Sequence, residues 1–193
     1  SIPFPMAGSA ACAFLANRQS DKTMKLKVEP LNPAAFAPFG EVISTATARD
    51  EYKINLGTTT RFHDISRVDV GDEGGIPIIS IFRGTPRPMP IEIKMMERHP
   101  LGSQAFVPLS GQKFLIVVAE GSDTPALEDL RAFISDGTQG VTYAKNVWHH
   151  PLLALEPESD FLIVDRSGPG NNLNEIDLPM VDDTPVTLDW PQT

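Results

Sequence analysis

Short runs of alternating hydrophobic and polar residues fill most of the chain. A period of two is typical of β-strands with one face in a core. Residues 113–121, KFLIVVAEG, are instead a continuous apolar run, which predicts a strand buried on both faces. Residues 140–155 predict a strand, a turn and a second strand. The remaining predicted strands are 26–31, 41–44, 52–56, 61–65, 76–84 and 161–168.

Helical signals occur in only two places. Asn32-Pro33 before AAFAPFG is typical of a short helix with an Asn cap, a proline in its first turn and a glycine after it. PALEDLRAF at 125–133 follows Ser-Asp-Thr and predicts a second, longer helix. Many short strands with frequent Pro and Gly predict an all-β sandwich or barrel with one or two short helices.

Length and charge restrict the possible functions. The 193 residues are enough for one domain with a full core. A formal net charge of −9 argues against nucleic acid and anionic membrane surfaces as partners. An anionic substrate would therefore need a locally positive pocket. We find no apolar stretch long enough to span a membrane.

The first 23 residues differ from the rest. They are rich in small residues, show no clear period and lack the positively charged start of a signal peptide. We expect residues 1–23 to be a leader or an upstream extension, and residues 24–193 to form a single domain. The one cysteine, Cys12, lies in this leader and excludes an intrachain disulfide framework. A reducing, cytoplasmic compartment is the expectation.

Two polar residues that could take part in catalysis or metal binding lie at the end of one predicted strand. In the stretch 91–99, alternation places Glu97 and His99 on the face shared by Ile91, Ile93 and Met95, at the mouth of a core. A desolvated carboxylate and imidazole are costly, so such a placement needs a functional reason.

The spacing of these residues resembles the two cupin motifs. Glu97-x-His99-(x4)-Gln104-(x6)-Gly111 follows the first motif, although Glu97 replaces its first histidine and Gln104 its glutamate. Asn146, three residues before His149, stands where the second motif has a glycine in a left-handed turn. Asn is the residue that best replaces Gly in that conformation. His149 would then point inward.

A longer series of segments resembles one family. INLG, RFHD, ISIFRG, ERHPLGSQAFVPL, LRAFISDGTQGVTY, NVWHHPLLAL and DFLIVDRSG occur in that order. From about residue 24 to 178 the chain closely resembles the bacterial ureidoglycolate lyase family. The resemblance implies a cupin-like β-barrel that forms homodimers and splits ureidoglycolate into glyoxylate and urea in allantoin (purine) breakdown. It also implies nickel as a cofactor, with no organic cofactor.

Two roles are open for the inner cluster. His99, His149 and Glu97 form a plausible divalent-metal set, with Gln104 as a weak neutral fourth ligand. Without a metal, His99 or His149 is the general base, because a histidine pKa lies near working pH, and Glu97 orients it.

Other polar residues are candidates for binding the substrate. Arg61 or Arg83 would bind the substrate carboxylate, because a guanidinium grips a carboxylate with two parallel hydrogen bonds. His63, Gln104 and Asn146 are further candidates for polar contacts.

Purely structural roles remain open for several of these residues. Glu97 could pair with Arg83 or with Arg98 of the partner subunit, and Arg61 with Asp64 or Glu41 at the dimer interface. Two other functions also remain open: another metal-dependent cupin enzyme acting on a small organic acid, and a non-catalytic binder of small acids.

Overall fold

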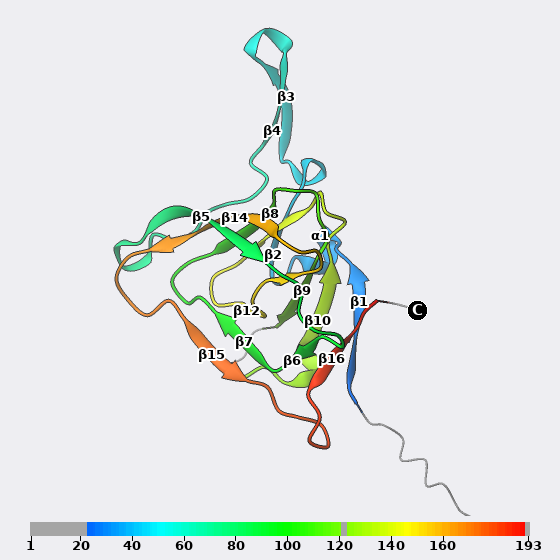
Figure 1. Ribbon diagram of the computed structural model, residues 1–193. Coiled ribbons are helices and arrows are strands. Elements are labelled where there is room, and N and C mark those ends of the chain that lie inside the picture. Colours follow the sequence, from blue (N-terminus) through cyan, green and yellow to red (C-terminus); the bar gives the residue numbers. More distant parts are fainter. Residues whose placement is uncertain (1–22, 121–122, 192–193) are drawn as a thin grey trace, which may run out of the picture.

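Two curled β-sheets face each other and form most of the molecule (Figure 1). The computed structural model describes residues 23–120 and 123–191, so the expected leader lies outside it except for Thr23. The nine-stranded sheet has the order β15-β7-β12-β9-β10-β1-β16-β6, with β13 beside β9. Its strands are β1 (Lys25–Pro30), β6 (Glu92–Ile93), β7 (Met95–Arg98), β9 (Phe114–Ala119), β10 (Leu130–Ile134), β12 (Trp148–His149), β13 (Leu153–Ala154), β15 (Asn174–Asp177) and β16 (Val186–Asp189).

The second sheet has five strands in the order β2-β11-β8-β14-β5. They are β2 (Gly40–Ile43), β5 (Ile76–Gly84), β8 (Gln104–Pro108), β11 (Gly140–Tyr143) and β14 (Ser159–Ser167). These two curled, mostly antiparallel sheets make the chain an all-β protein of the cupin-like type, as the alternation predicts.

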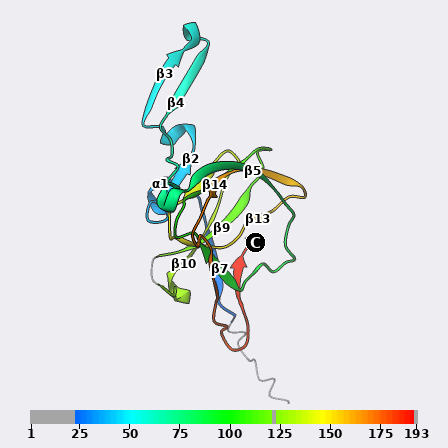
Figure 2. The same ribbon diagram turned by 90° about the vertical axis from the view of Figure 1, so that its left-hand side faces the viewer.

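A hairpin arm stands out from the body (Figures 1 and 2). It consists of β3 (Asp50–Ile54) and β4 (Thr59–His63), which pair only with each other. The helices are all short: α1 (Pro33–Phe36) and the 3-10 turns η1 (Thr45–Thr47), η2 (Asn55–Gly57), η3 (Asp72–Gly74) and η4 (Leu127–Asp129). Within the described ranges, no helix has the length and apolar character needed to cross a membrane.

Several local predictions are confirmed. The Asn32 side chain caps α1 by accepting hydrogen bonds from the N–H groups of Ala34 and Ala35, at 2.9 and 3.2 Å. β5 spans the predicted residues 76–84. Every residue of β9 is buried, as its continuous apolar run predicts.

The longer predicted helix at 125–133 is wrong. This segment forms the short turn η4 and then β10, which pairs antiparallel with β9 and parallel with β1. Leu130 and Ala132 enter one core while Phe133 enters another. Tertiary pairing on both edges and burial on both faces therefore outweigh the local helix propensity of this segment.

β9 separates two hydrophobic cores. Leu115 and Val117 face a core made by the nine-stranded sheet alone. Phe114 and Ile116 face the space between the two sheets, where they meet Phe161 and others from the second sheet. Aromatic side chains make up much of this inter-sheet core.

The single face predicted for residues 91–99 is also wrong, because the strand breaks at Lys94. β6 ends at Ile93 and β7 begins at Met95. Met96, rather than Met95, is then buried in the same core as Ile91 and Ile93. Glu97 consequently lies on the opposite face of β7, toward the inter-sheet space.

Asn146 forms the expected left-handed turn. Its φ is 66°, and its N–H donates to the carbonyl of His99 at 2.9 Å. The turn before β12 is thereby fixed to the end of β7, which sets His149 beside Glu97.

Removing an aromatic ring from the inter-sheet core should be costly. Phe161 is fully buried and packs edge-on against Phe114, with ring centroids 5.0 Å apart. We expect Phe161→Ala to lower the free energy of unfolding by about 3–5 kcal/mol, because it leaves a cavity. Leu109→Ala, at an exposed loop position, should change it by no more than about 0.5 kcal/mol. Urea denaturation measures both, and equal losses would contradict this core assignment.

The left-handed turn gives a second stability test. Asn146→Gly should retain full stability, because glycine adopts positive φ without a steric penalty. Asn146→Val should lose about 1–2 kcal/mol, because a β-branched residue is strained there. Thermal unfolding distinguishes the two variants. A valine variant as stable as the glycine variant would show that the turn is not left-handed.

Candidate active site

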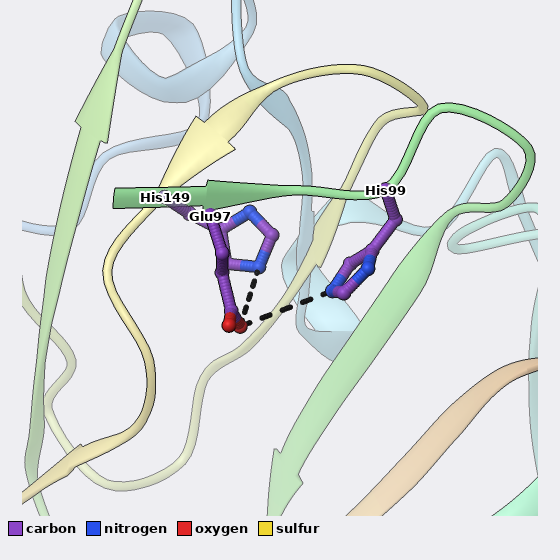
Figure 3. A group of neighbouring side chains, drawn as sticks. All are labelled: Glu97, His99 and His149. Carbon is purple, nitrogen blue, oxygen red and sulfur yellow. Dashed lines mark ion pairs between the residues drawn. The ribbon is translucent and has the colours of Figure 1, made fainter. Parts of the chain in front are cut away.

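Three side chains from two neighbouring segments converge beside the inter-sheet core (Figure 3). Glu97 lies on β7, His99 directly follows that strand, and His149 is the register partner of Glu97 on β12. One ligand atom from each lies within 4.8 Å of the others. Glu97 Oε1 is 3.5 Å from His149 Nε2 and 3.9 Å from His99 Nε2.

Backbone carbonyls fix how both imidazoles present their nitrogens. His149 Nδ1 is 3.0 Å from the carbonyl oxygen of Val147, and His99 Nδ1 is 2.8 Å from that of Asn172. A carbonyl oxygen only accepts hydrogen bonds, so Nδ1 carries the proton in each ring. Each ring therefore turns its Nε2 toward Glu97, and His99 Nε2 also faces the amide oxygen of Gln104. This arrangement of the second nitrogen is typical of metal-binding and proton-accepting histidines.

Tyr143 holds the His149 ring from the other side. The two rings stack in parallel, with centroids 4.1 Å apart and planes 11° apart. Burial and the nearby Glu97 charge both raise the pKa of the Tyr143 hydroxyl, so it stays neutral. The rotation of His149 is thus restricted by a ring face and a hydrogen bond together.

Gln104 and Asp165 extend the cluster beyond His99. Gln104 Oε1 lies 3.2 Å from His99 Nε2. Asp165 Oδ1 is buried without a hydrogen-bond partner, and burial raises the pKa of this carboxyl although Gln104 and His99 oppose the rise. These side chains border a recess of about 290 Å³, which Arg166 also lines.

The Glu97 carboxylate calls for a positive charge at the centre of the cluster, either a proton on an imidazole or a metal ion. Burial alone would raise the pKa of Glu97, but the neighbouring imidazoles of His149 and His99 more than offset this, and the pKa is lowered. His149 Nε2 is buried and has no hydrogen-bond partner. A carboxylate and two nitrogen lone pairs facing one point repel each other unless a cation lies among them. Two imidazoles and a carboxylate are a donor set that suits a divalent transition metal, and a proton on Nε2 is the alternative.

An open recess reaches the cluster from the Glu97 side. Its volume is about 690 Å³, large enough for a small organic acid, and its lining includes Glu97, Phe106, Arg83 and Arg87. Small molecules thus have a route to the carboxylate side of the cluster.

The sequence-predicted residues fall into two groups. Glu97, His99, Gln104 and His149 come together, and Asn146 positions the turn between them. Arg61 and His63 lie on the hairpin arm, and neither lines the recesses beside the cluster. The Arg61 guanidinium lies over Tyr52 instead, 5.9 Å from its ring centre.

Within the described part of this one chain, Glu97 does not pair with Arg83, and Arg61 pairs with neither Asp64 nor Glu41. Asp64 pairs with Arg67 at 2.9 Å rather than with Arg61. Arg83 makes two hydrogen bonds to Asp160, at 2.7 and 2.8 Å, rather than one to Glu97.

His150 occupies different surroundings from His149. Its Nδ1 is 2.8 Å from the carbonyl oxygen of Pro151, and burial lowers its pKa to about 4. It lines a separate recess of about 300 Å³ with Arg87 and Met95. This neutral imidazole is not part of the Glu97 cluster.

Sequence reasoning missed three contributors. Asn172 acts through its backbone carbonyl, which no motif can mark because every residue has one. Tyr143 could have been found from strand register, since it pairs with Gln104 across β11 and β8. Arg87 stands between Pro86 and Pro88 in a rigid loop, a signal that the strand pattern did not use.

Comparison with known proteins agrees with this geometry. The sequence profile of the ureidoglycolate lyase family matches residues 23–183. A protein named "Ureidoglycolate lyase" from Burkholderia mallei (strain NCTC 10229) is 58% identical over 154 residues, which cover 80% of this chain and 89% of that protein. One of the same name from Pseudomonas syringae pv. syringae (strain B728a) is 56% identical over 151 residues, 78% of this chain and 88% of its own length. The chain belongs to the ureidoglycolate lyase family.

Proposed function

We propose that this chain cleaves ureidoglycolate into glyoxylate and urea, a step in allantoin breakdown. The names of its relatives support the choice of substrate. The observation that carries the proposal is the convergence of Glu97, His99 and His149 beside an open recess. Residues 24–193 would act as one domain, which agrees with the family match at 23–183.

The substrate sets three chemical requirements. One carbon of ureidoglycolate bears a hydroxyl, a carboxylate and a urea nitrogen. Cleavage removes the hydroxyl proton, forms the C=O bond of glyoxylate and breaks the carbon–nitrogen bond. The electron pair of that bond leaves with the urea nitrogen, which takes up a proton. The site must therefore accept one proton, donate one proton and hold an anion.

The cluster can meet the two proton requirements. In its unprotonated form, Nε2 of His99 or His149 accepts the hydroxyl proton, and the Glu97 carboxylate stabilises the imidazolium that forms. The same imidazolium then protonates the leaving nitrogen. The hydrogen bonds at Nδ1, and Tyr143 at His149, keep the rings oriented during both transfers.

The same residues suit the nickel ion that the family resemblance implies. The unpartnered Nε2 of His149 and the two-imidazole, one-carboxylate donor set fit a divalent ion, which Glu97, His99 and His149 would hold, with Gln104 as a weak fourth ligand. When bound, such an ion supplies Lewis acidity that lowers the pKa of the substrate hydroxyl.

We further propose that the chain works as a homodimer in the cytoplasm. β5 is an edge strand, pairing only with β14 within the described residues. Its side chains Ile76, Ile79 and Ile81 are 59%, 71% and 54% exposed. A long apolar edge strand favours pairing with another chain, and the family resemblance names a second copy as that chain. The cytoplasmic location rests on the single cysteine, Cys12.

Activity on racemic ureidoglycolate tests the cluster. The wild-type chain should release urea and glyoxylate in equal amounts, without ammonia. His99→Ala, His149→Ala and Glu97→Gln should each lower kcat by about 100-fold or more, because each removes a proton acceptor or its stabilising charge. Glu128→Gln, at an exposed position outside the cluster, is the matched control for Glu97→Gln and should keep full activity.

The same assay can contradict the proposal in three ways. Ammonia in place of urea would identify a hydrolase. Full activity in both histidine variants would remove the cluster from the mechanism. Binding of glyoxylate without turnover would favour a non-catalytic binder. Repeating the assay with a chelator shows whether the positive charge in the cluster is a metal ion or a proton. Loss of activity that added nickel restores would identify a metal ion, and unchanged activity would identify a proton.

Assembly has its own test. Ile79→Asp should convert the dimer to a monomer in analytical ultracentrifugation at micromolar concentration, because it buries a charge in the expected interface. Leu109→Asp, also at an exposed apolar position but off β5, should stay dimeric. A wild-type chain that sediments as a monomer would refute the homodimer.

A further inference from the structure

An anionic substrate needs a cation beside the Glu97 cluster. The chain carries a net charge of −9, and the recess that reaches the cluster is bordered by the Glu97 carboxyl group. The recess that ends at Glu97 is lined by two cationic side chains, Arg83 and Arg87. A substrate carboxylate in this recess would therefore bind to Arg83 or to Arg87.

Arg83 is already occupied. Its Nε and Nη2 donate to the two carboxylate oxygens of Asp160, at 2.7 and 2.8 Å, across paired strands β5 and β14. A bidentate pair uses the same guanidinium edge that a substrate carboxylate would need. Binding substrate at Arg83 would first require breaking that pair.

Arg87 is free to bind. It makes no hydrogen bond or ion pair with any of the described residues, although it lines the recess together with Glu97. On its other side Arg87 lines a second recess together with His150. A guanidinium without a carboxylate partner, beside an open recess, is available to an incoming anion.

The backbone holds Arg87 in place before any ligand arrives. Arg87 stands between Pro86 and Pro88 in the segment that leads from β5 in one sheet to β6 in the other. Proline fixes its own φ and restricts the residue before it to extended conformations. Less backbone entropy is therefore lost when the loop binds a ligand.

We propose that Arg87 is the residue that binds the substrate carboxylate. The inference rests on the proposed cleavage of ureidoglycolate, and it replaces Arg61 and Arg83 as the sequence-based candidates. Arg87 anchors the carboxylate while the reacting hydroxyl and carbon–nitrogen bond lie toward Glu97 and the two imidazoles. It acts in binding rather than in proton transfer.

Steady-state kinetics of Arg87→Met, with glyoxylate and urea as product inhibitors, test this role. We expect KM for ureidoglycolate to rise about 10- to 100-fold, the effect of losing a charge-assisted pair, while kcat changes less than about threefold. Inhibition by glyoxylate, which has a carboxylate, should weaken by the same factor. Inhibition by urea, which has none, should stay unchanged. Arg87→Lys should be intermediate, because it keeps the charge but loses the planar fork.

Two further variants make the result specific. Arg67→Met removes an exposed arginine that lines neither recess, and it should match the wild type in every constant. The proposal is overturned if Arg87→Met behaves like Arg67→Met, or if Arg83→Met alone shows the carboxylate-specific loss. Equal weakening for urea and glyoxylate would also overturn it, because a general distortion does not distinguish the two.

Failure of the proposed function gives a different signature. A wild-type chain that releases no urea refutes the cleavage of ureidoglycolate. Calorimetric titration of glyoxylate into the wild type, Arg87→Met and Arg67→Met tests the carboxylate site without any turnover. Equal affinities in the three proteins refute the role of Arg87.

Discussion

The site depends on one electrostatic constraint: a carboxylate oxygen and two imidazole nitrogens face each other and need a positive charge among them. The Glu97 carboxylate and the Nε2 atoms of His99 and His149 lie within 4.8 Å of one another. Such a group is stable only with a proton or a metal ion at its centre. Proton transfer and metal binding are therefore two uses of the same arrangement, and both need the two imidazoles held in fixed orientation.

The fold supplies that orientation from its backbone. Carbonyls of Val147 and Asn172 hold the Nδ1 protons, and Tyr143 holds the plane of one ring. The left-handed turn at Asn146 bonds to the backbone of His99 and so links the two histidine-bearing segments. Behind them, the aromatic core between the sheets resists rearrangement, because interiors of this density deform little. The tightly packed aromatic core thus keeps the neighbouring Glu97 cluster in place.

Sequence patterns predicted the parts of this structure that local chemistry decides. The alternation of apolar and polar residues predicted strands such as β5. Asn32 marked the start of the short helix, and Asn146 marked the left-handed turn. Motif spacing brought Glu97, His99, Gln104 and His149 together. These features depend on residues a few positions apart, so they can be read without coordinates.

Long-range pairing explains what could not be predicted. Residues 125–133 have helical composition, yet β10 forms because its backbone pairs with β9 on one edge and with β1 on the other. Arg83 was a candidate for binding the substrate carboxylate, but its partner Asp160 is 77 residues away in sequence. Arg61 shares the alternation of an ordinary strand, and only the coordinates show that its strand belongs to a projecting arm.

Nitrogen-15 NMR of the imidazole side chains tests the central constraint most directly. The spectra report which ring nitrogen carries the proton, and Zn²⁺ serves as a diamagnetic probe of the cation site. The account predicts protonated Nδ1 atoms in His99 and His149 at neutral pH, with both Nε2 resonances shifting together when Zn²⁺ is added. Protons on Nε2 with bare Nδ1 atoms, or Nε2 resonances that do not respond to the metal, would contradict it.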